Sequence, residues 1–451
     1  MMNIPHEKLK VIQEEVAGMV SDINSCVNWA DSYLDDETRY ATNYTLKKQR
    51  RVLSKIAEAV TQKPAIAFFG ASQMGKSYMV KNLLCDQKGL LNIKNHNNDP
   101  VDFLSKINPD GGGSESTSLI TRFTADNVQD PDLPPVKVKL LSPKDLIIIL
   151  CDTYLSDFKI RHESLRQEDI VSHLEALPGL LSAESQHMLQ EDDLYDIKEY
   201  LESNLHSEDY LGKFRDAHFW QVMAAKVHLL PVDKWCVALE VLWNKNKDLS
   251  ELFQRLINEL KRLGFASVGY TDFDAVTKDN KSIIDVTTLT GLLTDEEAIY
   301  SVTTAAGVFA IRPGYLCALS AEIIMGISDQ SVARRSFIKR NDILDFPGAR
   351  SRLKLTEQTH IQPENLAEML LRGKVSYLFN TYSQNYEINN LCVCTSSTRQ
   401  PDGRAVPGLV KDWIAKNIGE NSTERGRVLK AAPVPPLFVI FSFWNERLQF
   451  D

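Results

Sequence analysis

Apolar positions along the chain follow two periodicities, and their order predicts a mixed α/β protein. From residue 5 to residue 62, side chains such as Ile12, Val16 and Met19 recur every three or four positions, which predicts a helical hairpin. Two helices cannot bury an apolar stripe on their own, so the hairpin must pack on the rest of the chain or on a partner. The next apolar run, Ile66–Phe69, is short and continuous, which is typical of a buried parallel strand.

Later apolar runs divide the remaining chain into a helical part and a second α/β part. A strand is expected within residues 131–141, and Ser142–Asp145 (Ser-Pro-Lys-Asp) marks the start of a helix. Helical patterns then follow one another to about Gly264, and Ser282–Thr288 has the β-branched composition of a strand. The α/β pattern resumes at Gly307–Ile327, and the alternation of strands and helices from residue 341 on predicts a parallel sheet.

A phosphate-binding pattern follows the first predicted strand. The chain reads Gly70-Ala-Ser-Gln-Met-Gly75-Lys76-Ser77, which fits the P-loop pattern G-x-x-x-x-G-K-[ST]. In such a loop the glycines let backbone N–H groups face phosphate oxygens, the lysine reaches the β- and γ-phosphates, and the serine hydroxyl binds Mg²⁺. Chance matches occur, but a strand before and a helix after are the context that the pattern requires. The sequence therefore predicts nucleotide phosphate binding with Mg²⁺ as a cofactor.

Two downstream segments have the composition of nucleotide-sensing switches. Residues 108–123 combine three glycines with hydroxyl residues and end in Ile-Thr121-Arg-Phe, which indicates either a plain linker or a mobile loop that enters a strand. Farther on, an apolar strand ends in Asp345-Phe-Pro-Gly348. In an Asp-x-x-Gly switch the carboxylate holds Mg²⁺ through water and the glycine N–H contacts the γ-phosphate. Ser77, Thr121 and Asp345 are therefore the expected metal-binding residues.

These segments together predict an α/β fold of the P-loop NTPase (GTPase-like) class with a mostly parallel sheet. The expected organisation is an N-terminal helical hairpin (1–62), the first half of the P-loop domain (63–141), a mainly helical insertion (142–300) and the second half of the P-loop domain (301–451). Asp152 follows an apolar run like a Walker-B acid, but the capping signal at Ser142 favours a helix there.

The amino-acid composition limits which kinds of partner and which cellular compartment are expected. The 51 Lys and Arg residues and 60 Asp and Glu residues give a net charge of −9, which disfavours general nucleic-acid binding. Seven cysteines, none in a C-x-x-C pair, indicate buried thiols in a reducing compartment rather than a disulfide or zinc framework. No apolar run resembles a secretion signal or a membrane span, and a cytoplasmic protein is expected.

Two runs of like charge and one basic cluster need an explanation. The basic run Lys47–Arg51 lies in the second predicted helix, and residues 184–209 are strongly acidic. We interpret both as solvated faces, and the alternative for the basic run is contact with anionic lipid or a partner. Arg350, Arg352 and Lys354 follow the Asp-x-x-Gly segment and are expected either on a solvated face or at a phosphate or partner contact.

The segments GASQMGKSY, VDFLSKINPDGGGSESTSLITRF and LDFPGARSR resemble the bacterial "putative virulence factor" family of the SrfC type. The phrases LLRGKVSYLF and GLVKDWI add to this resemblance, which runs over most of the chain. More distantly, the P-loop, the Ile-Thr-Arg element and the Asp-x-Pro-Gly segment are similar to dynamin-like GTPases. The resemblance implies a GTPase-like domain that binds GTP or GDP, with protein partners or peripheral membrane contact.

The resemblance also assigns roles to particular residues. It implies nucleotide contacts from Gly70, Gly75, Lys76, Ser77, Tyr78, Gly348, Ser442 and Asn445. The catalytic loop position of dynamin-like proteins aligns with Ser72, so the implied catalytic residues are Lys76, Ser72, Gln73 and Thr121. Dynamin-like proteins pair across their nucleotide sites, which implies a nucleotide-dependent homodimer.

Three features depart from the GTPase pattern. Guanine is read by [NT]-K-x-D after a buried strand, expected here at Pro436–Phe441, but the chain continues Ser442-Phe443-Trp444-Asn445. An amide cannot accept both guanine N–H groups as a carboxylate does, which leaves guanine selectivity open. Ala349 occupies the position of the catalytic Gln of Ras-like proteins, which leaves open whether intrinsic hydrolysis is slow or absent. The chain ends soon afterwards, as expected for a fragment or a natural truncation.

Two functions are consistent with these residues. The first is a Mg²⁺-dependent nucleoside triphosphatase, with GTP favoured over ATP, whose helical parts respond to the γ-phosphate. The second is a degenerate GTPase fold that binds nucleotide weakly or not at all and acts as a scaffold for protein partners.

Overall fold

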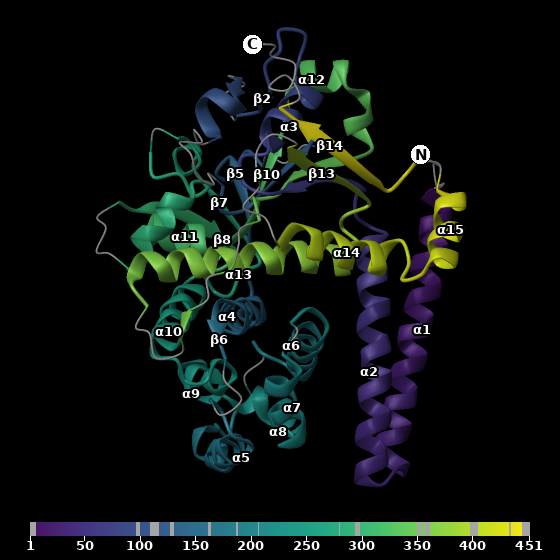
Figure 1. Cartoon of the computed structure of the whole chain (residues 1–451), viewed down its shortest axis with the longest axis vertical. Helices are drawn as coiled ribbons and strands as arrows, with labels where there is room; N and C mark the ends of the chain where they lie inside the picture. Colours follow the sequence, from purple (N-terminus) through teal and green to yellow (C-terminus); the bar gives the residue numbers. More distant parts are fainter. Residues whose placement is uncertain are drawn as a thin grey trace.

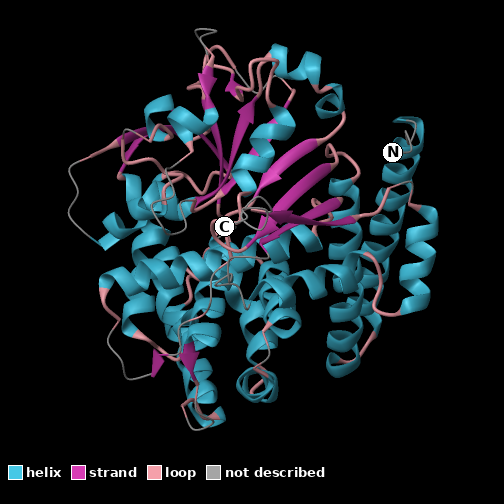
Figure 2. Ribbon diagram, turned by 45° about the horizontal axis from the view of Figure 1, so that its top comes forward, coloured by secondary structure: helices cyan, strands magenta, loops and turns pink. Residues whose placement is uncertain are grey.

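The computed structural model describes residues 6–95, 100–108, 117–126, 130–160, 164–185, 188–205, 207–278, 280–293, 298–349, 352, 355–356, 361–396, 405–432 and 434–443. A ten-stranded sheet lies in the upper part of the molecule, and most helices lie below or beside it (Figure 1, Figure 2). Its strands are β1 (Ala65–Gly70), β4 (Ile120–Thr124), β5 (Val136–Leu140), β7 (Val268–Thr271), β8 (Tyr300–Thr304), β9 (Gly307–Ile311), β10 (Ser320–Gly326), β11 (Asp342–Asp345), β13 (Asn390–Ser396) and β14 (Leu437–Ser442).

The sheet has a parallel part and a largely antiparallel part, in the strand order β14-β13-β1-β11-β4-β10-β5-β7-β8-β9. The strands β14, β13, β1 and β11 are parallel, whereas β4 is antiparallel to β11 and parallel to β10. Every neighbouring pair from β10 to β9 is antiparallel. The predicted α/β fold is confirmed, but the prediction of a mostly parallel sheet is wrong for the part of the sheet beyond β11. Two residues join β8 to β9, and only antiparallel strands allow so short a connection.

Helices cover both faces of the parallel part of the sheet. α3 (Lys76–Leu84) packs beside β1 and β11 on one face. α13 (Pro363–Gln384) lies on the other face, where Phe379 stacks on Phe69 of β1 with ring centroids 4.0 Å apart. Phe346 meets both rings edge-on. β1 is therefore covered on both sides, which explains its continuous apolar sequence.

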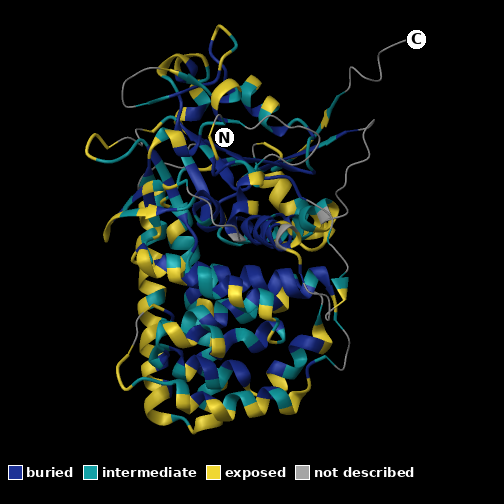
Figure 3. Cartoon of the chain, turned by 90° about the vertical axis from the view of Figure 1, so that its left-hand side faces the viewer, coloured by how far each residue is buried: buried dark blue, intermediate teal, exposed yellow. Residues whose placement is uncertain are grey.

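From residue 143 to residue 262 the chain is mainly helical, as predicted. The first helix of this helical part, α4 (Pro143–Asp157), begins at a capping box in which Ser142 and Asp145 each accept the other's backbone N–H. α4 lies between α13 and the remaining helices and is buried on nearly all sides (Figure 3). Those helices are α5 (Gln167–Ala176), α6 (Glu191–Asn204), α7 (Glu208–Asp216), α8 (Phe219–Lys226), α9 (Trp235–Leu239) and α10 (Lys247–Arg262).

Asp152 lies inside α4 and is fully buried, so its helical interpretation is confirmed. Its carboxylate forms an ion pair with Arg352, whose guanidinium also lies 3.6 Å from Asp157. Arg352 is thus neither on a solvated face nor at a phosphate contact, because it neutralises two buried carboxylates of α4. Arg350 and Lys354 lie outside the described residues.

The strand predicted at Ser282–Thr288 is wrong. The segment forms turns that lead into a 3₁₀ helix over Val286–Leu293. Thr288 donates its hydroxyl to the carbonyl of Ser282 at 2.7 Å, and Asp285 accepts the backbone N–H of Thr287 at 2.8 Å. These local side-chain bonds to the backbone stabilise turns at the expense of a strand.

The N-terminal helical hairpin is confirmed. It consists of α1 (His6–Tyr33) and α2 (Asp36–Ala59), which lie side by side at the right of Figure 1. Asp35 begins α2 by accepting the backbone N–H of Thr38 at 3.1 Å.

The basic run of α2 and the acidic run of α6 are not two separate solvated faces, because they pair with each other. Lys47 lies 2.7 Å from Glu191, and Arg50 lies 2.6 Å from Asp192. Arg51 is 7% exposed and pairs with three carboxylates, those of Asp192, Asp196 and Glu199. We call these pairs the hairpin ion-pair cluster. It attaches the hairpin to the helical part of the chain.

The remaining described elements are short or lie at the periphery. Within the described residues, no helix combines the length and the apolarity needed to cross a membrane. All seven cysteines are free thiols. The α-helices and β-strands not yet named are α11 (Pro313–Leu319), α12 (Asp329–Arg334), α14 (Ala405–Asn417), α15 (Ser422–Ala431), β2 (Asn92–Ile93), β3 (Val101–Asp102), β6 (Phe158–Lys159) and β12 (Leu355–Thr356).

Candidate functional site

The predicted phosphate-binding loop connects β1 to α3 at the carboxyl end of the parallel strands. β1 ends at Gly70 and α3 begins at Lys76, as the pattern requires. β11 and β13 flank β1, so their carboxyl ends lie beside the loop. Ligands of parallel α/β sheets bind at this edge, because helix N-termini and strand ends meet there.

Two glycines have specific roles in the geometry of this loop. A Cβ atom at Gly70 would lie 2.2 Å from the carbonyl oxygen of Cys394 in β13, a distance that real Cβ atoms essentially never show. Gly75 has φ of 76°, in the left-handed region that favours glycine. The non-glycine Gln73 is also left-handed, with φ of 58°. The loop is therefore a strained, closely packed turn, which is typical of functional loops.

The side chain of Lys76 folds back over the loop that precedes it. Its amino group is buried and donates to the backbone carbonyl of Ala71 at 2.9 Å. The amino group therefore lies at the loop itself.

The hydroxyl of Ser77 reaches the strand that carries the Asp-x-x-Gly segment. Ser77 donates from Oγ to Oδ2 of Asp345 at 2.6 Å, although the two residues are 268 positions apart. Asp345 is the last residue of β11 and is 6% exposed. The structure thus brings together two of the three residues predicted to bind a metal.

The segment after Asp345 runs along the beginning of the loop. Phe346 donates its backbone N–H to Phe68 at 3.1 Å, and Ala349 donates its own to Gly70 at 3.1 Å. Gly348 lies between these two contacts. The predicted second switch is therefore anchored to β1 on both sides of Gly348.

Thr121 lies within β4 rather than in the loop before it. It is 2% exposed and directly opposite Asp345 in the antiparallel pair, so both side chains are on the same face of the sheet. Two residues shortly before β4 are attached elsewhere: Thr117 bridges to Asp285, and Ser118 donates its backbone N–H to the carbonyl of Ile284 at 2.8 Å. The glycine-rich part of the predicted switch, residues 109–116, lies outside the described residues.

Arg122 points to the opposite face of β4 from Thr121 and takes part in a buried ion cluster. Its guanidinium lies 2.7 Å from Glu322, 3.2 Å from Asp342 and 3.3 Å from Glu387. Burial opposes the charge, but the carboxylate of Glu322 keeps the pKa of Arg122 above its ordinary value. Arg122 thus connects three elements of the core and is not part of the loop site.

The first two residues of the predicted base-binding segment, Ser442 and Phe443, lie close to the loop. Ser442 ends β14 and donates its hydroxyl to the carbonyl of Thr395 at 3.0 Å. The Phe443 ring lies 3.9 Å from the position of a Cβ on Gly75. An aromatic ring therefore borders the P-loop where the GTPase pattern has a lysine. Asn445 lies outside the described residues.

The other predicted site residues differ in their surroundings. Ser72 and Gln73 lie in the loop and are partly buried, and the side-chain nitrogen of Gln73 is enclosed with no hydrogen-bond acceptor in the described part of the chain. Tyr78 is 61% exposed on α3, with the Lys81 amino group 5.9 Å from its ring centroid. Tyr78 therefore faces away from the core, and the structure does not bring it to Asp345.

Sequence reasoning missed Cys394, which borders the loop. Burial raises the pKa of its thiol to about 12, and the nearby Lys76 partly opposes this. Its carbonyl limits the space at Gly70, as described above. Cys394 could not be found from the sequence, because β13 follows β1 by more than 300 residues and no motif marks it.

The donor set at the loop fits a hard cation. Among the described residues, no group of three or more His, Cys, Asp and Glu side chains could hold a metal ion. The Ser77 hydroxyl and the Asp345 carboxylate supply oxygen ligands, which Mg²⁺ prefers, and Mg²⁺ keeps several waters when bound by so few protein groups.

Comparison with known proteins identifies the family. No curated protein matches the chain significantly. The sequence model of the family described as "Putative bacterial virulence factor" matches residues 32–445. Because this match covers most of the chain, the protein belongs to this family.

Proposed function

We propose that the protein is a Mg²⁺-dependent P-loop nucleotide-binding protein of the dynamin-like GTPase type, with GTP favoured over ATP, in which hydrolysis moves the switch segments. The observation that carries this proposal is the 2.6 Å hydrogen bond from Ser77 to Asp345. Two independent sequence patterns assign these residues to one metal ion, and a chance match to either pattern gives no reason for the two side chains to meet.

Four groups of the chain support the proposal of triphosphate binding. Ser77 would bind Mg²⁺ directly and Asp345 would bind it through water, with Thr121 on the same face of the sheet as the third group. When bound, the ion neutralises charge on the phosphates. Lys76, now on the Ala71 carbonyl, would transfer its hydrogen bond to a phosphate oxygen. Catalysis of this kind consists of positioning and charge stabilisation.

The rate of hydrolysis depends on the groups that orient the attacking water molecule. Ala349 has no side chain that orients a water molecule, so Ser72 and Gln73 remain the proposed catalytic loop residues with Lys76 and Thr121. We therefore expect slow turnover without a partner, and a nucleotide-dependent homodimer or a protein partner is the proposed source of faster turnover.

The second candidate is a scaffold with a degenerate GTPase fold, and one observation favours it. The Phe443 ring borders Gly75, so a specific contact to guanine from this position is lost. This alternative predicts nucleotide binding that is weak and insensitive to the base.

The test is a double-mutant cycle on Ser77 and Asp345. Binding of a non-hydrolysable GTP analogue is measured by calorimetry with and without Mg²⁺ for the wild type, Ser77→Ala, Asp345→Asn and the double variant. We expect each single substitution to remove the Mg²⁺-dependent gain in affinity and the double variant to lose little more. Ser25→Ala, on the exposed face of α1, is the matched control. An unchanged Mg²⁺ dependence in both single variants contradicts the proposal, whereas intact GTP after long incubation with a binding-competent wild type favours the scaffold.

A further inference from the structure

A short segment connects the proposed second switch to the helical part of the chain. It begins at Asp345, which ends β11 beside the P-loop. Farther along, Arg352 reaches α4, and β12 (Leu355–Thr356) pairs in parallel with β6 (Phe158–Lys159), which directly follows α4. We call residues 345–356 the connecting segment, and its described residues are 345–349, 352, 355 and 356. The connecting segment therefore contacts both the proposed nucleotide site and the end of α4.

The first end of the connecting segment is held against β1 next to the P-loop. Phe346 donates its backbone N–H to the carbonyl of Phe68 at 3.1 Å, and Ala349 donates its own to the carbonyl of Gly70 at 3.1 Å. The side chain of Phe346 has no exposed surface. These contacts hold Gly348, which lies between them in the chain, beside the loop.

The other end of the connecting segment is held by charge. The guanidinium of Arg352 forms an ion pair with Asp152 and lies 3.6 Å from Asp157, and neither carboxylate has any exposed surface. A carboxylate that has lost its water needs a cation nearby, and removal of the cation from a buried pair is strongly destabilising. α4 therefore favours the position of the connecting segment in which Arg352 stays against these two carboxylates.

α4 packs closely enough against α13 to pass a displacement on to it. A Cβ atom at Gly373 of α13 would lie 2.4 Å from the hydroxyl oxygen of Thr153 and 2.8 Å from the carbonyl oxygen of Ile149, so the two helices meet at their backbones. Close-packed interiors transmit strain instead of absorbing it. A shift of Arg352 and α4 is therefore felt by the neighbouring helices.

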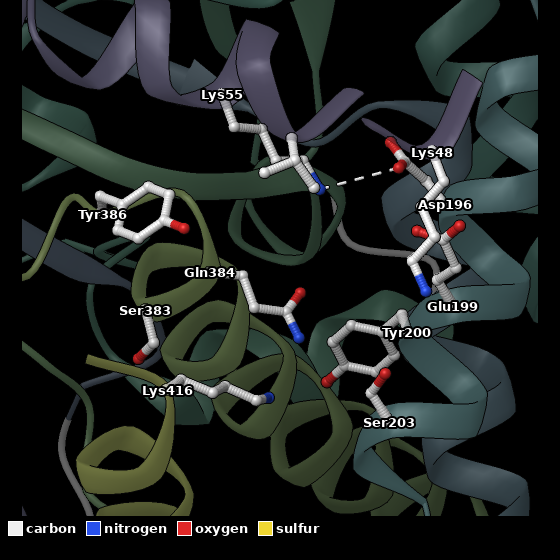
Figure 4. Close-up of a pocket in the computed structure, with 11 residues that line it drawn as sticks. Lys48, Lys55, Asp196, Glu199, Tyr200, Ser203, Ser383, Gln384, Tyr386 and Lys416 are labelled. Carbon is white, nitrogen blue, oxygen red and sulfur yellow. Dashed lines mark ion pairs between the residues drawn. The ribbon is translucent and has the colours of Figure 1, made fainter. Parts of the chain in front are cut away.

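On α6, which also packs on α4, the structure leaves room for movement. A pocket of about 280 Å³ lies between α6 and the C-terminal end of α13, with further walls from α2 and α14 (Figure 4). At the edge of this pocket, Lys55 of α2 contacts Asp196 of α6 at 3.7 Å (Figure 4), which helps to attach the hairpin to α6. A space of this size leaves room for α6 and the hairpin to shift relative to α13.

We propose that Arg352 couples the nucleotide site to the helical part, as a positioning residue that holds the connecting segment, and with it Gly348, at the P-loop. The inference rests on the proposed function, with Gly348 as the switch glycine whose N–H contacts the γ-phosphate. Because a diphosphate offers no γ-phosphate, the ion pair on α4 favours triphosphate binding over diphosphate binding. Coupling is reciprocal, so triphosphate binding in turn strengthens the hold of Arg352 on α4, and hydrolysis loosens it.

The first test compares the affinities of a non-hydrolysable GTP analogue and GDP, each with Mg²⁺, by calorimetry on the full chain. In Arg352→Met we expect the analogue to bind about tenfold more weakly and the affinity for GDP to change by less than about twofold. Arg255→Met is the matched control, because Arg255 forms an exposed ion pair with Glu251 on α10 of the same helical part. This control should leave both affinities unchanged.

Arg352→Met leaves buried carboxylates behind and can prevent folding, so a second variant removes the charges together. The combination of Arg352→Met with Asp152→Asn and Asp157→Asn replaces the buried charges by neutral groups, which proteins tolerate far better than an uncompensated buried carboxylate. We expect the same loss of about tenfold for the analogue in this triple variant.

Hydrogen exchange of the backbone amides in α4 and β6 separates coupling from a purely structural role. In the wild type, the amides of residues 152–159 should exchange about fivefold more slowly with the GTP analogue than with GDP. In the triple variant the exchange rates should be the same with both nucleotides, because the connection to the switch is lost. A residue with only a structural role would not make the exchange depend on which nucleotide is bound.

The outcomes distinguish this inference from the proposed function. Absence of binding of either nucleotide to the wild type would overturn both. The inference alone is overturned if the wild type binds both nucleotides but its ratio of analogue to GDP affinity is kept in the triple variant. It is also overturned if exchange in residues 152–159 of the wild type does not depend on the nucleotide, a result that needs no variant to fold.

Discussion

Lys374 is the clearest case in which one side chain lowers the stability of this protein. It lies on α13 with no exposed surface, and its amino group donates to the carbonyl of Cys317 at 2.7 Å. Within the described residues it forms no ion pair with a carboxylate. Burial lowers its pKa from 10.5 to about 8. The folded protein therefore holds this proton less tightly than the unfolded chain does.

The magnitude follows from this difference in pKa. One pKa unit corresponds to about 1.4 kcal/mol, so the protonated amine lowers the free energy of unfolding by roughly 3 kcal/mol below pH 8. The penalty fades as pH rises from 8 to 10.5, because the folded protein releases the proton first. Replacement of Lys374 by Met removes the penalty but leaves the Cys317 carbonyl without its donor, which costs about 1–2 kcal/mol. At pH 7 we expect Lys374→Met to be more stable by about 1–2 kcal/mol.

The assay is urea unfolding of wild type and Lys374→Met at pH 7 and pH 10, followed by tryptophan fluorescence in a reducing buffer. Thiols and tyrosines also titrate in this range, so the informative quantity is the difference between the two proteins, in which the groups that do not interact with Lys374 cancel. The difference should shift by about 2 kcal/mol in favour of the wild type between pH 7 and pH 10. Lys411→Met, on an exposed part of α14, should show no such shift. A Lys374→Met difference that is the same at both pH values would refute the reasoning.

Two further predictions concern the hairpin and the loop. Arg51→Met should lower the free energy of unfolding by about 2 kcal/mol and expose the hairpin to limited proteolysis, because it leaves the carboxylates of the hairpin ion-pair cluster without their buried partner. Arg50→Met, nearer the surface, should cost under about 1 kcal/mol. Equal losses of stability for the two variants in chemical denaturation would contradict this account. Gly70→Ala should destabilise the protein by about 1–3 kcal/mol, because the new Cβ clashes with the Cys394 carbonyl. Gly18→Ala, where a Cβ meets nothing within 4 Å, should stabilise α1 by about 0.5–1 kcal/mol. Thermal unfolding that ranks the two substitutions the other way would show that the loop is not closely packed.

The parts of the structure that could be predicted from sequence are those determined by local chemistry. The α4 start could be predicted because Ser142 and Asp145 cap each other three residues apart. The order strand, loop and helix around Gly70–Ser77 was visible for the same reason, since glycines and apolar runs act on their own neighbourhood.

The parts that could not be predicted depend on partners that are distant in the chain. Arg51 and Glu199 each have a charge typical of a solvated helix face, and only the packing of α2 on α6 makes them a pair. Arg352 likewise finds its carboxylates in α4, about 200 residues earlier. The antiparallel half of the sheet was missed because strand direction is determined by connections, which periodicity does not reveal.

The central claim is that the P-loop binds a nucleoside triphosphate together with Mg²⁺. The most direct measurement is calorimetric titration of wild type and Lys76→Ala with GTP, GDP, ATP and XTP in the presence of Mg²⁺, with Lys88→Ala as a control on an exposed lysine after α3. The account predicts Mg²⁺-dependent triphosphate binding that is strongest for GTP, is lost in Lys76→Ala and is retained in Lys88→Ala. Absence of nucleotide binding by the wild type, or equal affinities for wild type and Lys76→Ala, would contradict it.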